Sequence, residues 1–525
     1  MPASKPRFRS STLAGRPMAH RWFRRLARAA AVLWLLGPGV LLVATPALAV
    51  VACAFDPVTA TAAITFGPGD AITVGRSGSQ IEVNGAVCGI GPLIATMTTT
   101  DTVSFVGVAT ANESLTLDLS GGAFAPGVTV EGGGISEIEF SGVDLGDGTD
   151  TFAITGSSGP DSIAFSAAGI DLNGDGDVDV TFAGGGSSAI EAFTMNGAGG
   201  DDAGSATGFA QPLVLNGSAG DDVLSGGSGN DQISGGAGVD TASYASASAA
   251  VTVDLAVTGP QDTKGAGTDT LSGIERLIGS PFGDTLSGGP SNDSLDGAGG
   301  DDVLAGGPGA DTLAGGAGAD TVDYSGAGAG VVVDLQTGQA AGGAGDDTLT
   351  GSENVVGSDF VDSLVGDANA NALSGGSGSD VLEGGGGDDE LDGGAGSDTA
   401  VFTNAGGPVT VDLVAGTGSG QGVDGLVSME RVVGSSFGDT LLGNGKGNDL
   451  RGGPGDDLLS GRLRGDRLTG GAGNDRLQGA GGGDRLFGNA GADRLVGGPG
   501  KDLCKGGAGV DRLRGCEKKV GARPA

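Results

Sequence analysis

Large apolar residues return every nine positions along the last part of the chain, between Gly452 and Arg514. Each stands in the middle of a short x-U-x triplet, where U is apolar, and six glycine-rich residues separate one triplet from the next. A triplet is long enough for one brief strand with a single inward side chain. Apolar residues nine apart can line one interior only if strands and turns alternate in a coil, so the pattern predicts an all-β, parallel β-solenoid. The inward residues of this stretch include Leu468, Leu477, Leu486, Leu495 and Leu513.

An aspartate stands two residues before each of these apolar positions. The repeat can be written G-G-x-G-x-D-x-U-x, and it also occurs upstream, with Asn371 and Asn448 in the aspartate position of two copies. Its glycines allow positive φ and let neighbouring turns approach closely. The aspartates that follow this pattern are Asp222, Asp231, Asp240, Asp284, Asp293, Asp302, Asp311, Asp320, Asp362, Asp380, Asp389, Asp398, Asp439, Asp457, Asp466, Asp475, Asp484, Asp493, Asp502 and Asp511.

Carboxylates at one position of every turn form a column of like charge, which is unstable unless cations lie between them. Calcium fits such a column, because it takes about 6 to 8 oxygen ligands from carboxylates and backbone carbonyls. Magnesium fits poorly, since it requires a tight octahedron and keeps its waters. A disordered glycine-rich linker is the alternative, but a bias in composition alone would not keep the aspartates at one constant spacing. We therefore predict that the aspartates of the repeats bind several calcium ions.

The copy at residues 470–478, GGAGNDRLQ, resembles the hemolysin-type calcium-binding repeats, also called RTX repeats. This resemblance implies a parallel β-roll with calcium ions in its turns. The whole arrangement resembles secreted calcium-binding proteins of high-GC Gram-positive bacteria. Most RTX proteins of Gram-negative bacteria carry a C-terminal secretion signal, and the N-terminal signal described below departs from that pattern.

A longer period divides residues 216–433 into modules. Asp240 and Asp320 are 80 residues apart, and Asp320 and Asp398 are 78 apart. Each module combines a run of nonapeptides with an insert that holds an apolar strand and a return strand. Tyr244 and Tyr324 are interpreted as packing residues that close a run rather than as ligand-binding aromatics. An uninterrupted array follows at residues 434–516, and a tail at residues 517–525.

Residues 1–49 have the pattern of a secretory signal peptide, with arginines, an apolar run and small residues before a cleavage site. Cleavage would leave no membrane span. The pair Arg24-Arg25 keeps a twin-arginine signal open, and Cys53 keeps a lipid-anchored form open. Residues 50–215 are β-rich without helical periodicity. For them we expect an irregular solenoid, with a β-sandwich as the alternative.

Charge is distributed unevenly along the chain. Residues 1–49 hold eight of the 27 basic residues and no acid, so the remainder has 19 basic against 64 acidic residues, a net charge of −45. Residues 446–525 carry 15 basic and 10 acidic residues, a net charge of +5. The intervening segment should repel itself and stay expanded until cations bind, and ordinary nucleic-acid binding is disfavoured.

Arginine directly follows the aspartate in most repeats of the final array. Strand alternation places it opposite the inward leucine, and because repeats eighteen apart should stack, Arg467 and Arg485 should share one outer row. One interpretation is a solvated face that offsets the acidity of the turns and caps the roll. The other is a basic ladder that binds an anionic cell-wall or surface polymer. The arginines are Arg467, Arg476, Arg485, Arg494 and Arg512.

Two pairs of cysteines bracket the mature chain. Because export permits disulfides, we predict the bonds Cys53–Cys88 and Cys504–Cys516. Residues 171–179, DLNGDGDVD, resemble the start of an EF-hand loop, but Phe182 occupies the position of its bidentate glutamate. A degenerate calcium loop and a solvated acidic turn both remain open there.

The only histidine, His20, lies in the expected signal peptide. Its loss would exclude a Ser-His-Asp triad, a Cys-His pair and a His-ligated zinc site from the mature protein. We therefore expect a secreted, extracellular, non-enzymatic calcium-binding protein with a structural or adhesive role at the cell surface. The alternative is an extracellular enzyme that acts on polysaccharide through carboxylates in residues 50–215, with the rolls as a stabilising tail.

Overall fold

The computed structural model describes residues 52–56, 61–65, 71–77, 80–83, 86–87, 89–90, 93–94, 102–106, 114–119, 139–144, 151–172, 180–182 and 192–520. Every regular element in these segments is a β-strand. The described part therefore offers no helix of the length and apolarity that a bilayer crossing requires. The expected signal peptide at residues 1–49 lies outside the described residues, and so does the tail beyond residue 520.

Strands of consecutive repeats alternate between two sheets, which makes the predicted coil. Strand β25 (Thr285–Ser287) pairs with β27 (Val303–Ala305), and β26 (Ser294–Asp296) pairs with β28 (Thr312–Ala314). Both pairings are parallel and join residues eighteen apart. The central leucine of each triplet is fully buried between the sheets. The fold is thus an all-β parallel roll, as the period predicts.

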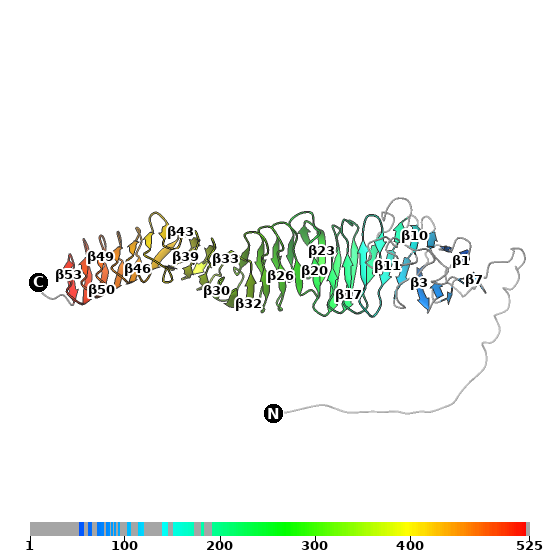
Figure 1. The fold of residues 1–525 in the computed structure, drawn as a ribbon, viewed down its shortest axis with the longest axis horizontal. Coiled ribbons are helices and arrows are strands. Elements are labelled where there is room, and N and C mark those ends of the chain that lie inside the picture. Colours follow the sequence, from blue (N-terminus) through cyan, green and yellow to red (C-terminus); the bar gives the residue numbers. More distant parts are fainter. Residues whose placement is uncertain are drawn as a thin grey trace, which may run out of the picture. The chain divides into compact units, whose positions relative to one another are not determined.

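The final array continues this arrangement without interruption from Thr440 to Val520 (Figure 1). Its odd-numbered strands belong to a 15-stranded sheet and its even-numbered strands to a 25-stranded sheet. They are β45 (Thr440–Leu442), β46 (Asp449–Pro454), β47 (Leu458–Ser460), β48 (Arg467–Ala472), β49 (Arg476–Gln478), β50 (Arg485–Ala490), β51 (Arg494–Val496), β52 (Leu503–Ala508), β53 (Arg512–Arg514) and β54 (Lys518–Val520).

Each insert forms a three-stranded antiparallel meander built into one side of the coil, although in the first insert only a single bridge, between Val251 and Lys264, joins the first two strands. Its third strand pairs in parallel with the run before it, and its first strand pairs with the run after it. The sequence indicates the first strand of each meander but not the central hairpin. The meanders are β21 (Thr252–Asp254), β22 (Gln261–Lys264) and β23 (Gly267–Ser272); β30 (Val331–Asp334), β31 (Gln339–Gly342) and β32 (Gly345–Thr350); and β41 (Thr410–Asp412), β42 (Thr417–Ser419) and β43 (Val423–Val427).

On the opposite side of the coil, the parallel stack of strands continues past each meander without a break. There the expected return strand stacks directly between the runs that flank it. The continuous stacks are β20 (Thr241–Ser243), β24 (Arg276–Ile278) and β26; β29 (Thr321–Asp323), β33 (Asn354–Val356) and β35 (Ala372–Ser374); and β40 (Asp398–Val401), β44 (Met429–Val433) and β46. The third run also contains β34 (Ser363–Val365), β37 (Val381–Glu383) and β38 (Glu390–Asp392).

The described strands before residue 220 extend the same solenoid. One ladder is parallel throughout and leads into the first repeats (Figure 1). Its interior is aromatic rather than leucine-only, and Phe193 meets Phe209 edge to face at 5.2 Å. Most of this parallel ladder lies in the β-rich region that we expected at residues 50–215. The ladder consists of β3 (Ala71–Ser77), β9 (Ser114–Asp118), β11 (Thr151–Thr155), β15 (Ala192–Asn196), β17 (Leu213–Ala219) and β19 (Gln232–Ala237).

Candidate metal sites along the turns

The repeat aspartates lie at the end of each turn with their side chains buried. Asp475, on the turn between β48 and β49, is 1% exposed. Its Oδ1 accepts a hydrogen bond from the backbone N–H of Asp457 at 3.0 Å, and its own N–H donates to Oδ1 of Asp493 at 3.0 Å. The next two turns continue the series to Asp511. Each carboxylate is therefore held by the backbone of the turn before it.

The second oxygen, Oδ2, has no hydrogen-bond donor in most repeats. A buried carboxylate oxygen without a donor is costly, because it has lost its water and gained nothing in return. This pattern calls for a positive charge that the protein atoms do not supply. The predicted aspartates with a buried, unpartnered Oδ2 are Asp222, Asp231, Asp240, Asp302, Asp311, Asp320, Asp380, Asp398, Asp457, Asp466, Asp475, Asp484, Asp493, Asp502 and Asp511.

The first glycine of each repeat provides the space into which Oδ2 points. A Cβ placed on Gly488 would contact both Oδ2 of Asp493 and the carbonyl oxygen of Gly506 in the next turn. The same pair of oxygens faces Gly479, from Asp484 and Gly497. Two acceptors therefore converge on one point with no donor between them. This is the arrangement that a hard cation with carboxylate and carbonyl ligands requires.

Carboxylates alone do not surround these points. Among the described residues, no three side chains of His, Cys, Asp or Glu gather in one place. An ion in the turns must therefore take most of its ligands from backbone carbonyls, with one or two carboxylates from adjacent turns. Calcium accepts such a mixed oxygen set, so the donors present fit calcium.

Burial raises the pKa of these carboxyls in the absence of a cation. Desolvation raises the pKa of Asp457 and of Asp466 to about 7, and the N–H donated by the preceding turn only partly opposes it. Desolvation likewise raises the pKa of Asp302 and Asp380 to about 6. Ionisation of these carboxyls therefore costs more free energy than ionisation of an exposed aspartate until positive charge arrives.

Each of the three nonapeptide runs that follow an insert begins with an aspartate whose two oxygens are both hydrogen-bonded. The backbone N–H of Ser435 donates to Oδ2 of Asp439 at 2.6 Å, and its hydroxyl donates to Oδ1 at 2.7 Å. Ser280 and Ser358 bind Asp284 and Asp362 in the same way. These three aspartates are on the predicted ligand list, but their Oδ2 atoms are already hydrogen-bonded. Oδ2 of Asp293 is likewise bound, by the N–H of Gly289 at 2.6 Å.

Glutamates that the repeat frame does not include occupy the aspartate position after each run. Glu275 and Glu353 accept the N–H of Asp240 and Asp320 at 3.0 and 2.9 Å. Glu430 does the same for Asp398 at 3.3 Å, across an insert of the third module. All three stand in the frame E-x-U-x-G-S, so a search for glutamate in place of aspartate would have found them.

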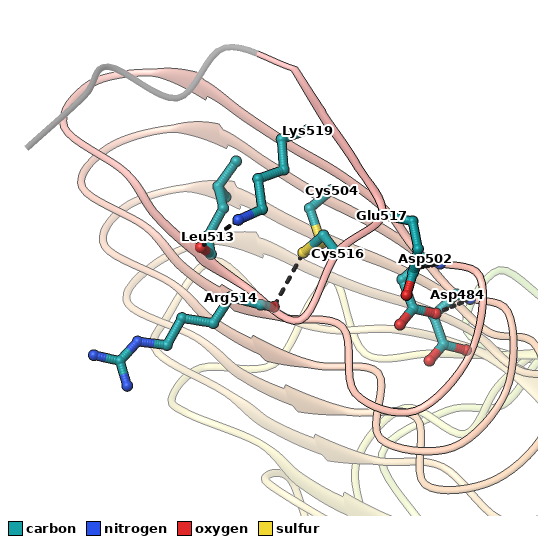
Figure 2. Close-up of a disulfide and its surroundings, with 8 residues drawn as sticks. All are labelled: Asp484, Asp502, Cys504, Leu513, Arg514, Cys516, Glu517 and Lys519. Atoms are coloured by element: carbon teal, nitrogen blue, oxygen red, sulfur yellow. Dashed lines mark hydrogen bonds between the residues drawn. A yellow bond between two sulfur atoms is a disulfide. The ribbon is translucent and has the colours of Figure 1, made fainter.

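The C-terminal column ends in the same way. Glu517 accepts the N–H of Asp502, which in turn accepts the N–H of Asp484 (Figure 2). Beside it, Cys504 and Cys516 form a disulfide, which confirms that predicted pair. Cys504 fills an inward leucine position of the last turns. The other predicted pair includes Cys88, which lies outside the described residues, as do residues 173–179 of the EF-hand-like stretch.

The two asparagines in aspartate positions have a physical explanation. Each lies eighteen residues after one of the glutamates, whose backbone carbonyl faces the position. Nδ2 of Asn371 donates to the carbonyl of Glu353 at 2.8 Å, and Nδ2 of Asn448 donates to that of Glu430 at 3.3 Å. A carboxylate would place oxygen against oxygen there. Asparagine therefore fits because this position needs a donor.

In the first two meanders, a tyrosine hydroxyl donates a hydrogen bond to the aspartate at which a column of stacked carboxylates ends. The hydroxyl of Tyr244 donates to Oδ2 of Asp269 at 3.2 Å, and that of Tyr324 donates to Oδ2 of Asp347 at 3.0 Å. Both tyrosines are buried. They pack at the ends of two runs, as interpreted from the sequence, and they also hold two buried carboxylates that the repeat frame does not include.

Comparison with known families agrees with this geometry. A family model described as RTX calcium-binding nonapeptide repeat (4 copies) matches residues 214–242, 269–304, 278–313, 297–327, 339–354, 365–400, 433–463, 463–493 and 478–513. The unmatched stretches at residues 243–268 and 401–432 contain most of the first and third meanders. No curated protein is significantly similar to the chain.

Proposed function

Because the chain belongs to the RTX calcium-binding nonapeptide repeat family through residues 214–513, we propose that it is a secreted, non-enzymatic protein that folds on extracellular calcium. Its role is structural or adhesive, at or near the cell surface. The protein leaves the cell unfolded, stays expanded where calcium is scarce, and winds into the roll as ions fill the turns. Anionic polymer of the cell wall or surface is its candidate partner.

The observation that supports calcium-driven folding is the series of buried Oδ2 atoms without donors. When bound, calcium supplies the positive charge that makes adjacent carboxylates tolerable neighbours. Extracellular calcium modules have dissociation constants of about 0.1–1 mM, which suits a switch between the cytoplasm and the exterior. Ion binding then contributes directly to the free energy of folding.

Export is supported by three independent features. Residues 1–49 have the composition of a signal peptide, the remaining chain carries a net charge of −45, and a disulfide joins Cys504 to Cys516. Structural disulfides persist in oxidising compartments. A non-enzymatic role is supported by the buried aspartates of the repeats, which hydrogen-bond to the backbone of neighbouring turns.

Binding to isolated cell walls tests the proposal on the mature chain. We expect retention in millimolar calcium and release on chelation, with no change in the size distribution of neutral or acidic glycans. Turnover of a glycan that a single Asp→Asn change abolishes would instead establish the polysaccharide-acting enzyme. Retention that is equal with and without calcium would contradict calcium-dependent adhesion.

A further inference from the structure

Three arginines form a straight row on the outer face of the final array. Arg476 on β49, Arg494 on β51 and Arg512 on β53 are direct register partners in the 15-stranded sheet. All three are exposed, whereas Leu477 and Leu495 beside them point into the core. Neighbouring strands lie about 4.8 Å apart, so the row repeats a positive charge at that interval along the coil axis.

No acid neutralises this row. Among the described residues, none forms an ion pair with Arg476, Arg494 or Arg512. The strands β47, β49, β51 and β53 carry no acidic side chain at all, and a fourth arginine, Arg514, shares their outer face. The buried aspartates of the turns point into the coil rather than toward this face. The row is therefore a set of like charges that the protein itself leaves unpaired.

The matching row on the opposite sheet is different. There Asp449 on β46 precedes Arg467 on β48 and Arg485 on β50 in register. The Arg467 side chain lies 3.7 Å from Asp449 and packs over the ring of Phe487 at 5.0 Å. Arg451 also pairs with Asp449, at 3.0 Å. A solvated face that offsets local acidity describes this sheet, but it does not describe the row on the other side.

An unpaired row of guanidinium groups with even spacing fits a linear polyanion. Guanidinium binds carboxylate and phosphate in a bidentate manner. The spacing along the row is close to the length of one sugar unit in an extended chain. The outer positions of these strands hold no aromatic side chain on which nucleic-acid bases could stack.

We propose that Arg476, Arg494 and Arg512 bind a linear surface polysaccharide or wall polymer that carries a carboxylate or phosphate on successive units and runs along the coil axis. This inference rests on the proposed calcium-folded, adhesive role and assigns the binding face. Because the row stands on the roll, the polymer site exists only once the turns are ordered by calcium.

The test compares two triple variants of the mature chain at one fixed concentration of free calcium. In the first, Arg476, Arg494 and Arg512 become Gln. In the control, Arg451, Arg467 and Arg485 become Gln, which removes the same charge from the opposite sheet. The probes are immobilised polygalacturonate, for carboxylates, and poly(glycerol phosphate), for phosphates. We expect the first variant to lose about tenfold in affinity for at least one probe, and the control to lose little.

Three results would overturn the inference. These are equal losses in both variants, no loss in either, or duplex DNA that binds as tightly as the polymers through the same row. A calcium titration followed by circular dichroism accompanies each variant. If the wild-type chain does not fold with calcium, the proposed function fails. If it folds and the row variant still binds like wild type, only the present inference fails.

Discussion

The final array and the modules upstream share one repeat but differ in the length of their aspartate columns. In the array, one column runs from Asp439 to Asp511 through five consecutive turns of one side, each joined to the next by N–H to Oδ1 hydrogen bonds. In the third module the corresponding column has only Asp362, Asp380 and Asp398 before it reaches Glu430. The repeats are alike, so the inserts set the column length.

Their outer faces differ as well. The upstream strands β25, β27, β29, β33, β35 and β38 carry no basic side chain, whereas β49, β51 and β53 carry arginine. Since every Oδ1 depends on the turn before it, an ordered turn favours order in the next. We infer that the array loads calcium as one long cooperative unit and that the modules load as shorter units, each of which ends at a glutamate.

The largest effect is expected where two turns touch. Gly471 has φ of 135°, and a Cβ there would overlap the carbonyl oxygen of Gly453 in the turn below. Gly471→Ala should therefore cost about 3 kcal/mol or more. Hydrogen exchange should show lost protection through β48–β51, with the modules unchanged. Gly445→Ala is the control, because nothing lies within 4 Å of its added Cβ; protection lost equally in both would contradict the assigned turn geometry.

The next largest effect distinguishes the aspartates whose Oδ2 has no hydrogen-bond donor from those whose Oδ2 is already hydrogen-bonded. Asp475→Asn removes a charge from an Oδ2 that has no donor, whereas Asp439→Asn removes one from an Oδ2 that Ser435 already binds. Equilibrium dialysis at saturating calcium should find fewer ions bound by the first variant and an unchanged number bound by the second. An unchanged number of bound calcium ions in Asp475→Asn would mean that the aspartates with an unpartnered Oδ2 are not calcium ligands.

A smaller effect follows from the pH dependence of the calcium-free chain. Desolvation raises the folded-state pKa of Asp457 to about 7 and of Asp380 to about 6, above about 3.9 in an unfolded chain. Protonation therefore stabilises the metal-free coil below about pH 4, and this stability is lost as pH rises through the folded-state values. In chelator, the β signal should therefore fade as pH rises through about 6 to 7. A β signal that increased with pH would contradict the predicted direction of the pH dependence.

The smallest effect is expected at the end of the array. Cys516→Ser opens the disulfide to Cys504, which constrains only the last turn. Exchange protection should fall in β52–β54 and remain in β45–β49, measured with calcium present. Loss of protection throughout the array would mean that the disulfide, rather than the column, maintains its cooperativity.

Period and phase were enough to predict the coil, its inward leucines and the buried aspartates. The features that we did not predict are contacts made by residues at which the repeat is altered. Glu275 serves Asp240, which is 35 residues away, and its role appears only when the register across the insert is known. Asn371 has the place of an aspartate, yet its role is set by a carbonyl eighteen residues earlier. The frame E-x-U-x-G-S marks Glu275 in the sequence, but its partner Asp240 lies across an insert, and the nine-residue spacing does not identify it.

The central claim is that divalent ions between stacked carboxylates hold the coil together. Its most direct test is a titration of the mature, signal-free chain from exhaustive chelation into calcium at pH 8, followed by circular dichroism and small-angle scattering, with magnesium as the control. The account predicts an expanded, largely unstructured chain that compacts into β-structure with calcium and not with the same concentration of magnesium. A chain that is equally compact and β-structured after chelation would contradict it.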